Sequence, residues 1–316
     1  MPAEGRVERQ RGRIPADIWR TQLRGIAQVA LSPSPWTGLL FTAGLFADSW
    51  RIGVYGLLGA AASALAAAVL GADREGLAAG LEGYCGCLTA LAVLVRFGAS
   101  WRTALLAVLA AAVCAVVRAA AGRLLGRAGL PALTAPFCLV AGALAVALPT
   151  APAAAPPAAG NGFTRLSAAQ FGHAFCDGVG QVFFLDQWYA GLILLAGLLV
   201  ASRTAAVAAA CGSLAAILVA CSMGLPADRV AAGLYGYNAV LVAIAVGATF
   251  LTLTPWTAGY TALAVVASVP LTAAWQSFVQ PSGGSPFTWP FVVTTWLFLA
   301  AAPALDRPGI SLQKAK

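Results

Sequence analysis

Roughly ten apolar runs, most of them close to the length that crosses a membrane, dominate this sequence of 316 residues. A hydrocarbon core of about 30 Å needs about 20 apolar helical residues. A chain that is 60% hydrophobic and only 9% charged cannot cover itself with a water-compatible surface. The sequence therefore predicts an all-α integral membrane protein with about ten transmembrane helices. The runs are 36–49, 52–71, 76–95, 103–122, 134–149, 189–202, 205–222, 230–250, 255–275 and 287–305.

The charged residues predict how such a chain lies in its membrane. If ten spans begin with the N-terminus inside, 14 of the 19 lysines and arginines fall on the cytoplasmic side, as the positive-inside rule requires. The first residues carry charges where a signal peptide has an apolar stretch, so no cleavable segment is expected. We expect a multi-pass protein of the cell (plasma or inner) membrane with both termini cytoplasmic. The net charge of +8 is an orientation signal directed at lipid and is not a nucleic-acid footprint.

A motif of glycine and aromatic residues occurs twice in the sequence, 153 residues apart. It is GLEGYCGCL at 80–88 and GLYGYNAVL at 233–241. Three further pairs follow the same order along the chain, two at this offset and the last at 154. Such repetition predicts two copies of about five spans each, and an odd number of spans turns the second copy upside down. The pairs are RGIAQV (24–29) with DGVGQV (177–182), WTGLL (36–40) with YAGLI (189–193), and LTAPF (133–137) with FTWPF (287–291).

The repeat and the composition divide the chain into five parts. The stretch TAPAAAPPAAGNG at 150–162 is rich in proline, alanine and glycine, which suits an extramembrane linker between the copies. A shorter half-membrane or re-entrant helix is expected before the first span of each copy. The predicted parts are a cytoplasmic tail (1–22), a first membrane repeat (23–149), a linker (150–168), a second membrane repeat (169–305) and a cytoplasmic tail (306–316).

These phrases together resemble the urea transporter family. The resemblance runs from about Leu23 to Ala302, and LPALTAPF at 130–137 is its most specific motif. It implies a homotrimer whose protomers conduct independently, each through a selectivity filter between the repeats that passes urea down its gradient. The residues that the repeat and the resemblance assign to this passage are Gln28, Val29, Leu31, Tyr84, Leu88, Thr134, Gln181, Val182, Phe184, Tyr237, Leu241 and Thr288.

The chain departs from the family pattern at four places. Cys85 stands where the family commonly has asparagine and where the second copy has Asn238. Tyr84 and Tyr237 occupy positions often held by phenylalanine, and Leu31 lies where an aromatic residue is usual.

Matched glutamines and threonines are the polar candidates. A glutamine amide in a bilayer needs a partner. Gln28 and Gln181 therefore either face a polar passage, one near each mouth, or cap neighbouring helix ends or hydrogen-bond across helices. Thr134 and Thr288 each lie two residues before a proline. Proline frees the carbonyl four residues earlier, near Ala132 and Pro286. We expect the two threonines to meet near the midplane, in a row of oxygens that replaces the hydration of an N–H-rich molecule.

Two aromatic–leucine pairs supply the apolar counterpart. Tyr84 with Leu88, and Tyr237 with Leu241, each share one helix face because residues i and i+4 lie one above the other. They either pack in an ordinary core or form the flat walls of a slot. Urea is planar and fits a slot edge-on.

The sequence lacks the residue patterns expected of an ion-coupled carrier, an enzyme or a metal protein, and this helps to distinguish between possible functions. Ion-coupled carriers keep carboxylates or histidines at membrane depth, and Glu82 has only Tyr235 as its repeat partner, so a symmetric relay is not expected. His173 and Asp177 share a helix face without a nucleophile motif, so no enzyme is expected. One histidine and an isolated Cys85–Cys87 pair predict no metal or other cofactor. The leading hypothesis is passive, channel-like urea transport, and the alternative is an ion-coupled secondary transporter of another small polar solute that uses Glu82.

Overall fold

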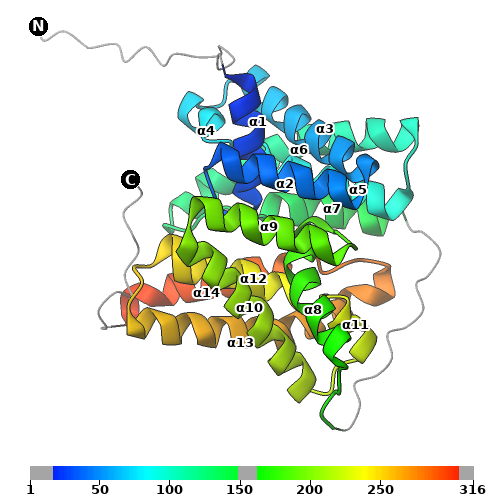
Figure 1. The fold of residues 1–316 in the computed structure, drawn as a ribbon. Coiled ribbons are helices and arrows are strands. Elements are labelled where there is room, and N and C mark those ends of the chain that lie inside the picture. Colours follow the sequence, from blue (N-terminus) through cyan, green and yellow to red (C-terminus); the bar gives the residue numbers. More distant parts are fainter. Residues whose placement is uncertain (1–16, 149–161, 306–316) are drawn as a thin grey trace, which may run out of the picture.

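The computed structural model describes residues 17–148 and 162–305, and its regular elements form two groups of helices that follow each other along the chain (Figure 1). Most of the predicted tails and linker lies outside these ranges. The first group holds α1 (Ile18–Ala27), η1 (Gln28–Ala30), α2 (Pro35–Asp48), α3 (Trp50–Val69), α4 (Arg74–Ala78), α5 (Tyr84–Phe97), α6 (Trp101–Gly126) and α7 (Ala135–Ala147). The second holds α8 (Ala168–Gly180), η2 (Gln181–Phe183), α9 (Trp188–Ala201), α10 (Arg203–Ser222), α11 (Ala227–Ala231), α12 (Tyr237–Ile244), η3 (Ala245–Phe250), α13 (Pro255–Val279), η4 (Gln280–Ser282), α14 (Trp289–Ala301) and η5 (Ala302–Ala304).

The apolar helices fall into two length classes. Among the described residues, four stretches are long and apolar enough to cross a membrane: α3, α6, α10 and Pro255–Ser282. The pair α8 and α9 adds a fifth when its 72° bend is counted within one span. The other predicted runs contain shorter apolar helices, such as α5 and α7.

Two predicted spans are not single helices. The runs 76–95 and 230–250 each begin in a five-residue helix, α4 or α11, and turn sharply before α5 or α12 begins. The turns use Gly80 and Gly233 at φ +79° and +71°, values that side-chain-bearing residues rarely adopt. A Cβ atom would also collide with the backbone of α1 at Gly80 and of α8 at Gly233. Hydropathy does not resolve these turns, because a turn of a few residues is averaged with the long apolar helix that follows it.

A π-helical turn explains why the repeat offset changes from 153 to 154. Helix α12 continues into the π-helical segment η3, whereas α5 stays regular. Leu88 and Leu241 are 153 residues apart, but the N-caps of the next helices, Ser100 and Thr254, are 154 apart. The extra residue therefore lies between Leu241 and Thr254, where the wider π turn accommodates it.

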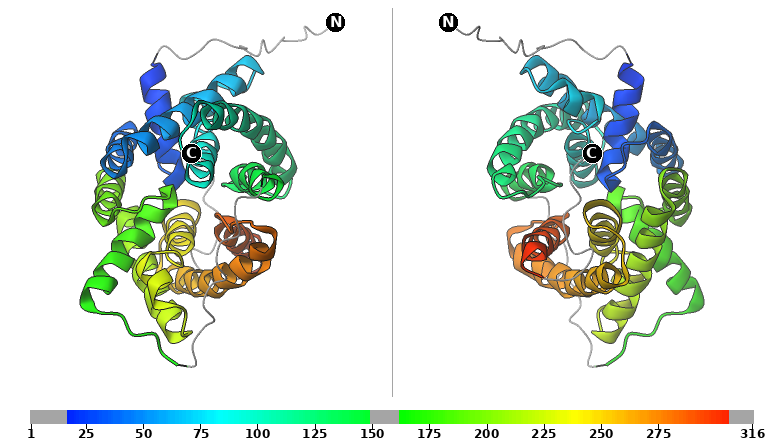
Figure 2. Two further views of the ribbon diagram at one scale, coloured as in Figure 1. Left: turned by 90° about the vertical axis from the view of Figure 1, so that its right-hand side faces the viewer. Right: turned by 90° about the vertical axis from the view of Figure 1, so that its left-hand side faces the viewer.

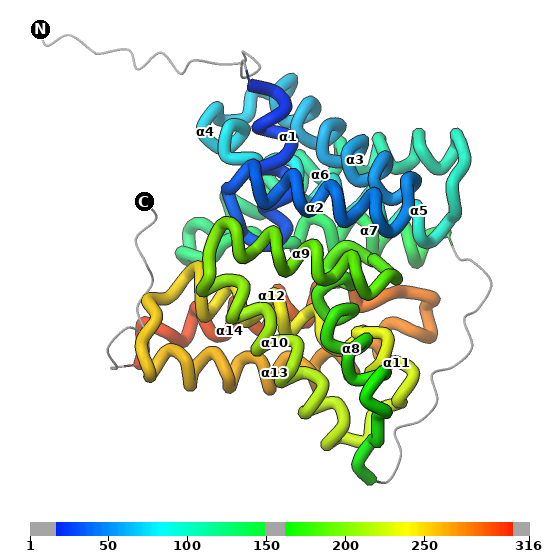
Figure 3. The backbone as a smooth tube through the Cα atoms, viewed as in Figure 1, coloured from blue at the N-terminus to red at the C-terminus, as the bar shows by residue number. Residues whose placement is uncertain are grey.

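The two groups meet where α2 and α9 run side by side (Figures 1 and 3). Seen from the sides, the first group stands above the second (Figure 2). The Thr37 hydroxyl donates to the Gly197 carbonyl over 2.9 Å, and each helix inserts a large side chain over a glycine of the other. Phe41 covers Gly197, and Leu194 covers Gly44. Both glycines allow close packing, since small residues let membrane helices approach.

Candidate functional site

Thr134 and Thr288 meet in the interior, between the two helix groups. Their hydroxyl oxygens lie 2.6 Å apart, so one donates a hydrogen bond to the other across the two groups. Each residue is the N-cap of a helix, Thr134 of α7 and Thr288 of α14, and both are at most 3% exposed. The Cys138 sulfur lies 3.1 Å from the Thr288 hydroxyl. The predicted meeting of the two threonines is confirmed.

The residue before each threonine has an unusual backbone. Leu133 and Phe287 have φ of 48° and 43°, the left-handed region that such side chains rarely enter. Their carbonyls accept the hydroxyls of Tyr84 (2.6 Å) and Tyr237 (2.7 Å), respectively. The tyrosines therefore hold a strained backbone in place, a role that the sequence interpretation as slot walls did not include. Backbone strain of this kind gathers at functional sites.

The carbonyls expected to be freed by proline are not free. Ala132 accepts the amide of Ala135 over 3.2 Å, and Pro286 accepts the amide of Trp289 over 3.1 Å. Both contacts close a tight turn at the start of the helix. The prediction that proline frees these two carbonyls is wrong, because each turn uses the carbonyl before the helix begins, and their place in a row of oxygens stays a prediction.

Cys85 and Asn238 occupy matching places with different bonding. Asn238 donates through Nδ2 to the Phe287 carbonyl (3.4 Å) and accepts the Phe291 amide at Oδ1 (3.1 Å). Cys85 directs its thiol at the Leu133 carbonyl over 3.7 Å. A thiol is a weak donor, so the strained carbonyl of the first group is held mainly by Tyr84.

An aromatic cluster marks one side of the threonine pair. Phe137, Phe184 and Phe287 contact one another edge to face, with centroid distances of 5.1 to 6.3 Å. The repeat-related positions are Phe291, Leu31 and Leu133. The repeat-related positions thus hold one aromatic and two aliphatic side chains in place of three aromatic ones. Sequence reasoning missed Phe137 and Phe287 as members, although both belong to the LTAPF and FTWPF phrases.

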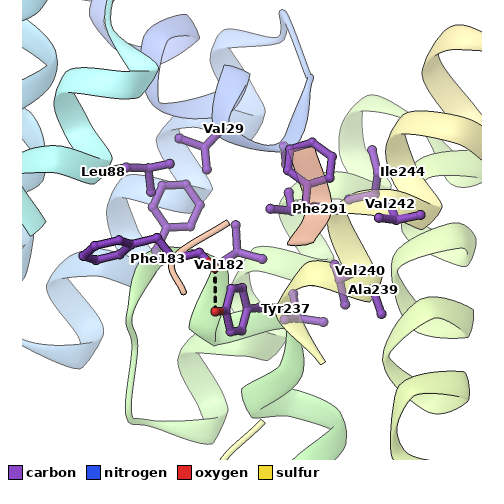
Figure 4. Close-up of a cluster of buried hydrophobic side chains, with 14 of the residues drawn as sticks. Val29, Leu88, Val182, Phe183, Tyr237, Ala239, Val240, Val242, Ile244 and Phe291 are labelled. Carbon is purple, nitrogen blue, oxygen red and sulfur yellow. Dashed lines mark hydrogen bonds between the residues drawn. The ribbon is translucent and has the colours of Figure 1, made fainter. Parts of the chain in front are cut away.

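The predicted apolar residues lie in one buried cluster. Val29 and Leu88 of the first group lie with Val182 and Tyr237 of the second among its members (Figure 4). Leu88 and Leu241 are fully buried. Leu31, at the left-handed end of η1, is half-buried and lines a cavity of about 330 Å³ with Ser202 and Thr249.

The two glutamines are bonded differently. Gln28 donates through Nε2 to the carbonyl of Ala79, the C-cap of α4, over 2.9 Å. Gln181 donates to the Leu185 carbonyl (3.2 Å) and to Asp186 Oδ1 (3.4 Å), both close to it in sequence. Gln28 thus caps a helix end, which is the second of the two sequence interpretations.

We expect Gln181→Leu and Gln28→Leu to separate the roles of these amides. Gln181→Leu should cut solute flux several-fold if Gln181 lines the passage, because one lost hydrogen bond is worth about 0.5 to 1.5 kcal/mol. Gln28→Leu should chiefly lower thermal stability, since it removes the side-chain donor of the Ala79 carbonyl at the end of α4. Stopped-flow flux and unfolding temperature, measured on both variants, provide the check. Normal flux and normal solute affinity in a folded Gln181→Leu protein would contradict the assignment.

Glu82 is held in a buried ion pair. Its carboxylate accepts a hydrogen bond from Nε of Arg118 over 2.6 Å and forms an ion pair with Nη2 of the same guanidinium. The Glu82 side chain is 3% exposed and that of Arg118 is 20% exposed. The Ser63 hydroxyl donates to the Glu82 carbonyl over 2.6 Å. A coupling carboxylate must bind and release its ion, and Arg118 already occupies this one.

Apolar helices of spanning length, with Thr134 and Thr288 buried between two helix groups, define a multi-pass membrane protein. The family model for urea transporters matches residues 19–303. The chain is 32% identical to urea transporter 1 of Ovis aries over 292 residues, and 30% identical to urea transporter 1 of Rattus norvegicus over 294 residues. Each match covers 88% of this chain and 75% of the relative. The chain belongs to the urea transporter family.

Proposed function

We propose that this protein conducts urea passively across a membrane, through a passage between its two helix groups. The observation that supports this most is the buried hydrogen bond between Thr134 and Thr288. Their hydroxyl oxygens lie 2.6 Å apart, and the two residues begin one helix from each group. Family membership supports urea as the solute. The urea transporters of sheep and rat, about a third identical in sequence, add to that support.

The passage follows from an inverted repeat of ten spans. Each group contributes five apolar helices of ten residues or more besides α1 or α8, counting α12 with η3, and an odd number turns the second group over. Matched close contacts support this arrangement: Gly38 lies against the Leu23 carbonyl as Gly191 lies against that of Cys176. We place the repeats at 23–149 and 169–305, with α1 and α8 as half-membrane helices, a linker at 150–168, and tails at 1–22 and 306–316 in the cytoplasm. The functional unit is a homotrimer in the lipid of a cell membrane.

The chemistry of the passage uses polar and apolar walls together. The hydroxyls of Thr134 and Thr288 exchange their mutual hydrogen bond for the N–H groups and carbonyl of urea. Val29, Val182 and the leucine pair then exclude water, so that only a solute satisfied by these oxygens passes. Because conduction needs sites that bind weakly enough to release, a mutually satisfied hydroxyl pair suits a central barrier. Phe184 and Leu31 flank the two ends of the slot, with Tyr84 and Tyr237 supporting it from behind.

Passive transport follows from the bonding of Glu82. With its carboxylate paired to Arg118, the ion-coupled alternative lacks a free carboxylate at the position that the sequence offered for it. Urea then moves down its own gradient.

Urea flux into proteoliposomes tests this function. We expect initial rates that are the same with and without an imposed proton or sodium gradient, since no ion moves with the solute. Vesicles without protein measure the background leak. Accumulation of urea against its gradient when a proton or sodium gradient is imposed would select the ion-coupled carrier instead.

A further inference from the structure

Asp177 on α8 carries a buried oxygen without a partner. Its side chain is 8% exposed, and Oδ1 has no hydrogen-bond partner among the described residues. Arg229, on the neighbouring α11, forms no ion pair with it within the part of the chain that the structure describes. Ionisable groups at membrane depth are costly and pair with something. His173 on the same helix and Asp186 both act electrostatically on this carboxylate, but neither forms a hydrogen bond with Oδ1, so this oxygen points to a ligand.

In the first helix group, the position that matches Asp177 is occupied by a positively charged side chain. Arg24 lies at the matching position of α1, 153 residues earlier, and its Nη1 donates to the Ala78 carbonyl over 2.8 Å. Gln28 donates to the next carbonyl, that of Ala79. A guanidinium and an amide thus satisfy the exposed carbonyls at the end of α4, as helix C-termini require.

The second group has the same geometry and the opposite chemistry. The backbone of Asp177 lies directly against Gly233, as that of Arg24 lies against Gly80. Among the described residues no side chain donates to the carbonyls of Ala231 and Ala232 at the end of α11, because Gln181 donates to Leu185 and Asp186 instead. A carboxylate thus occupies the sequence position where the first group has a guanidinium, and the two carbonyls at the end of α11 lack the side-chain donors that those of α4 have.

We propose that Asp177 and the carbonyls of Ala231 and Ala232 bind a small planar cation of the guanidinium class, which takes the place that the Arg24 side chain fills in the first group. The bound cation lies one turn from Gln181 on α8. It narrows that end of the passage and slows urea entry. This site is separate from the threonine centre and goes beyond the proposed function.

Guanidinium itself is the probe, with tetramethylammonium as the comparison because it carries the same charge and no N–H group. Binding is measured by titration calorimetry on purified protein in detergent. We expect guanidinium to bind and tetramethylammonium not to. Asp177→Asn should weaken binding by about tenfold or more, since hydrogen bonds to a charged group are the strong ones. Asp228→Asn, which removes an exposed carboxylate of α11, is the matched control and should bind normally.

Asp177→Arg provides a second test that does not depend on losing a function. It places a tethered guanidinium at the site, so the variant should unfold at a higher temperature and bind no guanidinium. In flux assays, guanidinium should slow urea entry into parent vesicles and leave the relative rate of the Asp177→Asn protein unchanged. Absent binding in the parent, equal binding of tetramethylammonium, or binding retained in Asp177→Asn would each overturn the site. Parent urea flux without guanidinium tests the proposed function by itself, so the two failures are distinguishable.

Discussion

Replacing both central threonines, Thr134→Val with Thr288→Val, slows urea flux by about tenfold or more. Valine keeps the shape of threonine and removes the hydroxyls that stand in for water around the solute. A barrier raised by about 1.4 kcal/mol already gives a tenfold loss. Because the change is confined to the centre, urea binding nearer the mouths should change far less than flux. Equilibrium binding and flux, measured on the same preparation, report the two effects separately.

The matched control is Thr272→Val. Thr272 is also a buried threonine, 1% exposed, but its hydroxyl donates to the Ser268 carbonyl of its own helix over 2.7 Å. That variant should conduct like the parent. If the double variant also conducts like the parent, the threonine pair is a packing contact and the centre of the passage lies elsewhere.

Arg118→Met destabilises the protein by about 3 to 5 kcal/mol, because it leaves the Glu82 carboxylate buried and unpaired. Adding Glu82→Gln should recover part of this loss, since a neutral amide is cheaper to bury than a lone charge. Unfolding in detergent, followed for both single variants and the double variant, gives the coupling between the two residues. Arg123→Met, an exposed arginine of the same helix, is the control and should change little.

The same pair of variants tests the alternative function. A folded Glu82→Gln, Arg118→Met protein should still pass urea without dependence on a proton gradient. Equal stability of Arg118→Met and Arg123→Met would show that the ion pair contributes nothing to the fold. Loss of gradient-driven transport in the double variant would instead make Glu82 a coupling residue.

The broad architecture was predictable because hydropathy and repetition act over many residues. Each of the ten apolar runs contains a helix, and the offset between LTAPF and FTWPF placed Thr134 opposite Thr288. The repeat also pointed to Leu31 and Phe184, which share a left-handed backbone at φ 57° and 60°. Patterns that occur twice carry enough information to pair residues that are far apart in the chain.

Individual hydrogen bonds were not predictable. Gln28 bonds a carbonyl 51 residues away, and a backbone acceptor has no signature in the sequence. Glu82 and Arg118 were both visible, but they lie 36 residues apart and neither has a charged counterpart in the second group. The turns at Gly80 and Gly233 were hidden inside apolar runs. The sequence shows these glycines, but only the close approach of α1 and α8 explains them.

The π-helical turn η3 accommodates one residue more than the matching part of the first half, where α5 stays regular. Instead of shifting every later residue out of register, the chain stores the surplus within one widened turn, and Thr254 caps its helix just as Ser100 does. The second half is thereby one residue longer than the first, and Thr288 still reaches Thr134. A chimera that exchanges this segment between the halves should therefore move α12 and η3 as one unit, because a cut within the π turn would separate the extra residue from the turn that accommodates it and rotate everything that follows.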